Sequence, residues 1–283
     1  MDKIIENEIF GEERALYGIK DTIVRNCTFA GEEDGESALK ECRSIEIRDC
    51  DFSLRYPIWH ARDVKVYSSL FEETARAPFW YCHTGSLEDC KIRPVKFLRQ
   101  CENIMFKNCE IHSEELGWKC RGITISDSEL EGSYLFLDSE NVTLDNVHMR
   151  GKYSFQYMKD LVIRNSELDT KDAFWHSENV RVENCTVKGE YLGWFSKNLT
   201  FVNCRIEGTQ PLCYCENLTL TGCTMDGCDL SFEYSDVRAD IKGHIDSVKN
   251  VKVGEITADS IGEIINEDSV MECSCNITVK KAL

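Results

Sequence analysis

The sequence lacks a long apolar segment, since no stretch approaches the ~18 uninterrupted apolar residues of a membrane-spanning helix. Its first residues, MDKIIENEIFGEERALYG, also lack the apolar core of a signal peptide, so we expect a cytoplasmic protein. With four prolines it has no proline-rich linker.

Lys and Arg number 33 against 50 Asp and Glu, and the formal net charge is -17. Nucleic acids and anionic membranes bind basic surfaces, so we expect neither as a partner.

Cysteine is abundant instead, with sixteen residues. In the absence of a secretion signal, this number favours reduced thiols in a reducing compartment over a disulfide framework. We therefore expect buried free thiols, which behave as small apolar side chains.

An eight-residue pattern recurs at a spacing of nineteen residues through the middle of the chain. Seven copies, beginning at Ile104, Ile123, Val142, Leu161, Val180, Leu199 and Leu218, read IMFKNCEI, ITISDSEL, VTLDNVHM, LVIRNSEL, VRVENCTV, LTFVNCRI and LTLTGCTM. A fixed period of this length is typical of solenoids, in which each repeat buries its apolar side only against its neighbours.

Three columns of turn-forming residues accompany the repeat. One holds the corner of each octet, a polar column lies five residues earlier, and a glycine-rich column lies five residues later. The first consists of Asn26, Asp49, Ser68, Asp89, Asn108, Asp127, Asn146, Asn165, Asn184, Asn203 and Gly222. Its first gaps are 23, 19 and 21 residues, and all later gaps are 19. Asn, Asp and Gly tolerate the left-handed backbone of tight turns, so three columns predict three corners.

Between the corners, apolar and polar residues alternate with the period of two that strands require, as at Val180 and Val182. The prediction is an all-β protein: a single-stranded right-handed parallel β-helix, or solenoid, with triangular coils of about 19 residues. We expect residues 1–240 to form the solenoid. Because the register fades after Asp236, residues 241–283 are expected to add irregular closing coils, or a cap, to the same domain.

The third side of the coil carries the aromatic residues. All five tryptophans share one column, nine residues before the corner: Trp59, Trp80, Trp118, Trp175 and Trp194. A column of charged residues on this side must face water. If side chains alternate as in a strand, the tryptophans then point inward, and a Phe column and a His/Tyr column point outward. A bulge would reverse this assignment. In both cases an aromatic row faces solvent, and exposed apolar patches of this kind mark interfaces.

From this side we predict a binding face. It consists of His60, Tyr81, Lys119, Phe136, Phe155, Tyr157, Phe174, His176 and Tyr214. Arg99 and Gln156 interrupt the tryptophan column, and a buried arginine needs a partner. Either a local bulge turns these two residues outward, or they mark a gap in the stack that shapes a polar pocket near Arg99, Gln100 and Lys119.

The first long coil carries an acidic insertion that we expect to loop away from it. Its acids are Glu32, Glu33, Asp34 and Glu36. Adjacent acids on an exposed loop are usually solvated. His60 and His176 lie six coils apart, ~29 Å at ~4.8 Å per coil, and cannot share a metal. Because Cys215 belongs to an inward column, we predict that Cys213 and Cys215 are buried thiols, and we predict no metal or cofactor.

Distinctive stretches run from one end of the chain to the other. They are FGEERALYG, GEEDGESALKE, LRYPIWH, GWKC, YSFQY, DAFWH, GEYLGWFS, GTQPLCYC, FEYSDV and ADSIGEI. Through them the whole chain resembles a bacterial family of pectin-lyase-like right-handed β-helix proteins of unknown function, described as hydrolases by superfamily analogy. The resemblance implies the fold. Pectin-degrading β-helix hydrolases carry an Asp-Asp dipeptide and a Gly-His-Gly turn, and this sequence has neither, since Ile245 follows Gly243 and His244.

Two functions agree with these patterns. In the first, which we prefer because the hydrolase motifs are missing, the protein binds through its aromatic outer face. The partner is then a second copy, giving a homodimer, or a carbohydrate ligand. In the second, the protein is a carbohydrate-active enzyme, either a glycoside hydrolase or a polysaccharide-lyase-like protein, whose acids and His, Tyr and Lys residues converge on that face.

Overall fold

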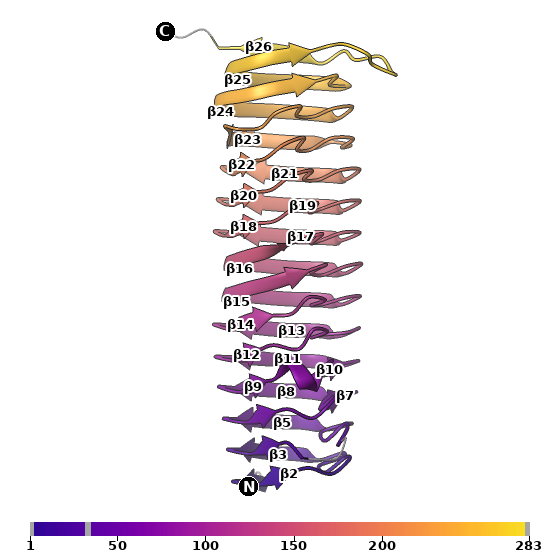
Figure 1. Ribbon diagram of the computed structural model, residues 1–283, viewed down its shortest axis with the longest axis vertical. Helices are drawn as coiled ribbons and strands as arrows, with labels where there is room; N and C mark the ends of the chain where they lie inside the picture. The colour runs from indigo at the N-terminus through magenta and orange to yellow at the C-terminus, as the bar shows by residue number, and fades with distance from the viewer. Residues whose placement is uncertain (1–2, 32–34, 281–283) are drawn as a thin grey trace. The chain divides into compact units, whose positions relative to one another are not determined.

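The computed structural model describes residues 3–31 and 35–280. These residues form the predicted all-β, single-stranded, right-handed parallel β-helix. The chain divides into two compact units, Met1–Thr143 and Leu144–Leu283, and each is a stack of coils (Figure 1). The one helical segment within the described ranges is the 3₁₀ turn η1 (Glu73–Ala75), and none of the helices there is long and apolar enough to cross a membrane.

The first unit contains two stacks of parallel strands and a third, turn-rich side. The longer strands pair in the order β1 (Lys3–Glu6), β3 (Lys20–Arg25), β5 (Arg43–Arg48), β8 (Arg62–Tyr67), β11 (His83–Glu88), β13 (Glu102–Lys107) and β15 (Arg121–Ser133). The shorter strands pair in the order β2 (Ile9–Phe10), β4 (Thr28–Phe29), β6 (Asp51–Phe52), β9 (Leu70–Phe71), β12 (Lys91–Ile92), β14 (Glu110–His112) and the end of β15. The third side carries β7 (Ile58–Trp59) and β10 (Phe79–Trp80).

The second unit repeats this arrangement. The element β16 (Glu140–Lys152) contains the boundary between the units. The longer strands are β17 (Lys159–Arg164), β19 (Glu178–Glu183), β21 (Lys197–Val202), β23 (Leu218–Met225), β24 (Asp236–Lys249), β25 (Val253–Ile265) and β26 (Asn276–Val279), and the shorter ones are β18 (Glu167–Asp169), β20 (Thr186–Lys188) and β22 (Arg205–Glu207). The last coils stay parallel, with a register shift between Ile241 and His244 that follows the point where the repeat fades.

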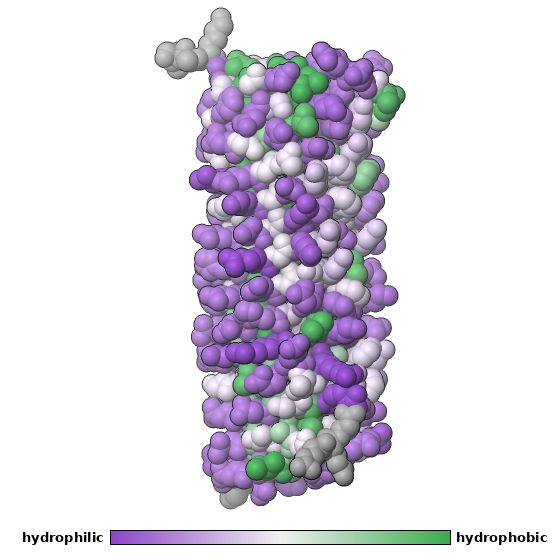
Figure 2. Space-filling view, viewed as in Figure 1, coloured by the Kyte–Doolittle hydropathy of each residue, from purple (hydrophilic) through white to green (hydrophobic). Residues whose placement is uncertain are grey.

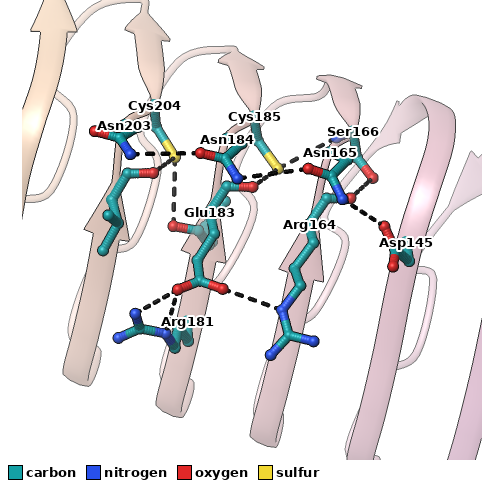
Figure 3. A network of polar contacts seen from close by, with 12 residues as sticks. Asp145, Arg164, Asn165, Ser166, Arg181, Glu183, Asn184, Cys185, Asn203 and Cys204 are labelled. Carbon is teal, nitrogen blue, oxygen red and sulfur yellow. Dashed lines mark hydrogen bonds and ion pairs between the residues drawn. The ribbon is translucent and has the colours of Figure 1, made fainter.

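Residues with positive φ occupy the predicted corners. Every member of the first corner column has φ between 46° and 64°. Amide side chains also bond from coil to coil, because Asn198 Nδ2 donates to Asn179 Oδ1 at 2.9 Å and Asn217 Nδ2 donates to Asn198 Oδ1 at 2.8 Å. Figure 3 shows the same relation between Asn184 and Asn165 in the first column. Stacked corners therefore fix the register between coils.

The glycine-rich column has a second cause besides the turn that was predicted, which holds at Gly227 (φ 77°). Gly189, Gly208 and Gly227 have positive φ, whereas Gly31 and Gly132 do not. A Cβ at Gly132 would lie 2.1 Å from the carbonyl oxygen of Ser113 in the preceding coil. Glycine is required at this position because neighbouring backbones approach closely.

Small Ser and Cys side chains cap main-chain donors after two of the corners. The N–H of Cys120 donates to Ser139 Oγ in the next coil at 2.9 Å, and Ser139 Oγ donates to the carbonyl oxygen of Gly117 at 2.6 Å. Sulfur takes the same place where the N–H of Cys101 donates to Cys120 Sγ at 3.4 Å. Figure 3 shows this arrangement at Cys185, which accepts from the N–H of Ser166. The column is small and polar because it must fit inside the coil and accept a hydrogen bond.

The interior is otherwise apolar and stacked. Phe29, Phe52 and Phe71 form a continuous column, with ring centroids 4.6 and 4.7 Å apart. All sixteen cysteines are free thiols, and fourteen of them are buried. On the face shown in Figure 2, hydrophilic residues predominate and hydrophobic residues appear as separate spots.

The third side corrects the predicted orientation of its aromatic residues. Phe136, Phe155 and Phe174 were predicted to face outward, but all three are buried with 0% exposure. The tryptophans, predicted inward, lie half-buried at the surface. Strand parity fails because positive φ recurs at every second residue, as at Phe174 (65°) and His176 (53°). This segment is a series of tight turns, so side chains do not simply alternate between its two faces.

The capping column predicts the effect of a single substitution. Ser139→Ala removes the acceptor of the buried Cys120 N–H and should lower the free energy of unfolding by ~1–3 kcal/mol. Ser139→Cys keeps an acceptor of the kind used elsewhere in the column and should cost clearly less. Chemical denaturation followed by circular dichroism measures both variants. An equal loss in both, or no loss in Ser139→Ala, would contradict the capping role.

Candidate functional site

A column of stacked aromatic rings lies on the outer side of the second unit. Tyr157 stacks on His176 with 5.0 Å between ring centroids and 8° between planes, and His176 stacks on Phe195 at 5.2 Å and 11°. Phe195 stacks in turn on Tyr214 at 4.7 Å and 16°. The exposed fractions of Tyr157 and Phe195 are 53% and 42%. We name these four residues the outer ladder.

Stacking limits what the outer ladder can bind. Each inner ring, such as His176, has a neighbouring ring on both faces, so only its edge remains accessible. A flat ligand needs a free ring face. Each stacked pair contributes ~0.5–1.5 kcal/mol beyond the area that it buries. The outer ladder therefore stabilises neighbouring coils, and its inner rings offer edges, rather than faces, to a partner.

The equivalent column in the first unit stops after two rings. His60 stacks on Tyr81 with 4.9 Å between centroids and 17° between planes. The next three positions of the column hold Gln100, Lys119 and Asp138. Because the rings stack from coil to coil, the second face of Tyr81 is turned toward these three non-aromatic positions.

A groove of about 440 Å³ lies where the aromatic rings stop, and we name it the ladder gap. Two rows of side chains line it, each with one residue per coil. The first row is Tyr81, Gln100, Lys119 and Asp138, and the second is His83, Glu102, Arg121 and Glu140. At ~4.8 Å per coil, the three steps from Tyr81 to Asp138 span ~14 Å. The ladder gap is thus an elongated polar groove with an aromatic ring at one end.

A hydrogen bond and an ion pair order the second row of the ladder gap. His83 Nδ1 lies 3.3 Å from Glu102 Oε2, and Arg121 Nη2 donates to Glu140 Oε2 at 3.0 Å.

The first row of the ladder gap has fewer partners. Trp80 Nε1 donates to Gln100 Oε1 at 3.4 Å, which leaves the amide nitrogen of Gln100 available. Lys119 and Asp138 form no ion pair with any residue in the described ranges. A donor and an acceptor are therefore both unengaged in one groove.

Arg99, which interrupts the tryptophan column, is paired. Its guanidinium forms an ion pair with Glu115 and lies 4.1 Å from the centre of the Trp118 ring. The side chain is only 12% exposed, so these contacts offset the cost of burying its charge. Of the three residues predicted to surround a polar pocket, Gln100 and Lys119 line the ladder gap, whereas Arg99 packs beside it in the neighbouring column.

A family model matches residues 3–278, and its description is "Protein of unknown function (DUF3737)". The chain belongs to this family. No curated protein matches the chain. This member of the family has a β-helix fold. The geometry of its own residues is the basis for its proposed function.

Solved structures are similar to the family member at low sequence identity. The A-module of the mannuronan C-5 epimerase AlgE6 from Azotobacter vinelandii is 10% identical with a TM-score of 0.40, and the match covers 98% of this chain and 89% of that one. DFA-IIIase from Arthrobacter chlorophenolicus A6 without its lid is 11% identical with a TM-score of 0.44, covering 99% and 89%. PfbA, a surface adhesin of Streptococcus pneumoniae, is 12% identical with a TM-score of 0.36, covering 86% and 74%.

The nine residues predicted to form one face lie in three settings. Three belong to the ladder gap or stack behind it: Tyr81, Lys119 and His60. Three belong to the outer ladder: Tyr157, His176 and Tyr214. Three are core residues: Phe136, Phe155 and Phe174. The second row of the ladder gap was not predicted, because its charged residues were expected only to face solvent. The nineteen-residue spacing nevertheless places these charged residues beside Gln100, Lys119 and Asp138.

The predicted acidic loop is only partly within the described ranges. Glu36 forms an ion pair with Arg55 at 2.9 Å, while Glu32, Glu33 and Asp34 lie outside these ranges. In residues 3–31 and 35–280, no three His, Cys, Asp or Glu side chains are grouped as in a metal site. Burial raises the pKa of Cys213 to about 12, which keeps its side chain a neutral thiol rather than the thiolate that zinc requires.

Proposed function

We propose that the protein binds a carbohydrate and holds a short oligosaccharide in the ladder gap. The observation that carries this proposal is the interruption of the aromatic column after Tyr81, which leaves Tyr81 without an aromatic ring on the next coil, at the end of a polar groove. A sugar presents an apolar ring face and hydroxyl groups that both donate and accept. The ring of Tyr81 can pack against the apolar face of the sugar, and Lys119 and Asp138 can form hydrogen bonds with its hydroxyl groups.

The size and charge of the ladder gap fit such a ligand. Its volume of about 440 Å³ lies within the ~300–1,000 Å³ of small-molecule sites. Two cationic residues, Lys119 and Arg121, face three acids, Glu102, Asp138 and Glu140. This near balance favours a neutral, hydroxyl-rich molecule over a polyanion. We still expect neither nucleic acids nor anionic membranes as partners, because both are polyanions and the protein has a net charge of -17.

Binding alone fits the groove better than hydrolysis. Most glycoside hydrolases use two carboxylic acids on opposite sides of the scissile bond. Here the carboxylate of Glu102 lies 3.3 Å from His83 Nδ1, Glu140 is held in an ion pair with Arg121, and Asp138 is the one acid of the groove with neither kind of contact. A carbohydrate-active enzyme remains the alternative, and the release of shortened or unsaturated sugars would identify it. The cytoplasmic location stays a prediction.

The carbohydrate proposal is tested with a glycan array followed by calorimetric titration of the best ligand. Lys119→Ala should weaken binding at least about tenfold, because a hydrogen bond to a charged group contributes ~1.5–3 kcal/mol. Tyr81→Ala should weaken it as well. The matched controls are Lys91→Ala on β12 and Phe195→Ala in the outer ladder, and both should bind as wild type. Failure of every glycan to bind, or unchanged affinity in both groove variants, would refute the proposal.

The outer ladder supports a second candidate function, the formation of a homodimer. Tyr157 and Phe195 present ring edges two coils apart, with 53% and 42% exposure. Two copies related by a two-fold axis would bring the same edges together, which is the commonest way to close an assembly. The observation that favours this candidate is that the exposed rings form a continuous row rather than isolated side chains.

The homodimer is tested by sedimentation of wild type and of Tyr157→Glu/Phe195→Glu. If the outer ladder is the contact, wild type sediments as a dimer and the double variant as a monomer with unchanged circular dichroism. Met105→Glu on β13 is the control, because Met105 is 57% exposed but lies outside the outer ladder. A monomeric wild type would exclude the homodimer without bearing on the ladder gap.

A further inference from the structure

The nineteen-residue spacing breaks a second time between Ser68 and Asp89, which lie 21 residues apart. The extra residues lie in a coil that forms the 3₁₀ turn η1 between β9 and β10. The turn ends at Arg76, with φ 57° and ψ -81°. These angles resemble those of the rare, strained γ-turn, and strained non-glycine residues cluster at functional sites.

A pocket of about 510 Å³ lies beside η1, within the first unit. The rings of Tyr56 and Trp80 meet in its lining edge to face, with centroids 6.4 Å apart and 64° between planes. Val95 and Ala77 add apolar surface. We name this hollow the insertion pocket.

Cations also line the insertion pocket. Arg76 is exposed and forms no ion pair with any residue of the described ranges. Lys96 lies 3.9 Å from Glu115, whose closer partner is Arg99. Glu73 is the one acid among the lining residues. In a protein of net charge -17, this pocket combines an excess of positive charge with an aromatic corner.

We propose that the insertion pocket is a second binding site, distinct from the ladder gap, for a small ligand that carries a carboxylate on a ring. The ring packs against Trp80 and Tyr56, and the guanidinium of Arg76 pairs with the carboxylate, a geometry that arginine favours. Trp80 lines the insertion pocket, and Tyr81, which is adjacent in sequence and stacks on Trp80 with 5.7 Å between ring centroids, lines the ladder gap. The ring of the ligand is either aromatic or a sugar ring, because Arg76 would pair with a carboxylate on either one.

Four probes separate the contributions of ring and charge: benzoate, glucuronate, benzyl alcohol and acetate. Each is titrated into the full-length protein and followed by tryptophan fluorescence and ligand-observed NMR. Benzoate or glucuronate should bind, and benzyl alcohol and acetate should bind at least about tenfold more weakly. Binding of benzoate alone identifies an aromatic carrier, and binding of glucuronate alone identifies a sugar carrier. Added salt should weaken the interaction, because exposed charges are screened.

Two substitutions assign the binding to the insertion pocket. Arg76→Gln should weaken the better probe at least about tenfold, whereas Arg93→Gln, an exposed arginine outside the lining, should not. Trp80→Leu should abolish the fluorescence change, and circular dichroism verifies that it is folded. A probe that loses affinity in Lys119→Ala but not in Arg76→Gln binds in the ladder gap instead, which separates failure of this proposal from failure of the proposed function. The proposal is overturned if neither carboxylate binds, if benzyl alcohol binds as well as benzoate, or if Arg76→Gln binds as wild type.

Discussion

Each coil of this protein satisfies many of its polar main-chain groups through the coils beside it. At the corners, residues with positive φ turn the chain, and the donors that follow are reached by a small side chain of the next coil, as when Ser139 accepts from the N–H of Cys120. A left-handed conformation costs a non-glycine residue ~1–2 kcal/mol. The repeated corners are tolerated because hydrogen bonds between coils and buried columns such as Phe29 on Phe52 offset that cost. This constraint explains why Ser, Cys, Asn and Asp recur at nineteen-residue spacing.

The same stacking turns each side-chain position into a column, so a change of residue type along a column changes the surface. Gln100 and Lys119 have φ of 49° and 55°, close to the 56° of Tyr157 and the 60° of Phe195 in the outer ladder. The backbone at the ladder gap is therefore the one that carries aromatic rings elsewhere. The groove follows from the choice of side chains, and the insertion pocket follows from a local change in chain length at η1.

The regular parts of the molecule were predictable because they repeat. The spacing of the octets, the corner column with Asn108 and the inward cysteines with Cys109 predicted a parallel β-helix with buried thiols, and the structure has both. The third side was not predictable by strand parity. Phe155 is buried and Trp175 is half-exposed because positive φ at alternate residues replaces a strand by turns. The ladder gap was predicted only in outline, from the polar residues near Gln100, since its second row comes from another column.

The central claim is that the interruption of the aromatic column forms a binding groove, and filling it tests this claim most directly. In Gln100→Tyr/Lys119→Phe, aromatic rings would continue the column from Tyr81 on a backbone already suited to them. The measurement is the dissociation constant of the best glycan for this double variant, with the thermal unfolding midpoint as control. The account predicts a midpoint at or above that of wild type, because stacked pairs stabilise neighbouring coils, together with loss of glycan binding. A folded double variant that binds the glycan with wild-type affinity would contradict it.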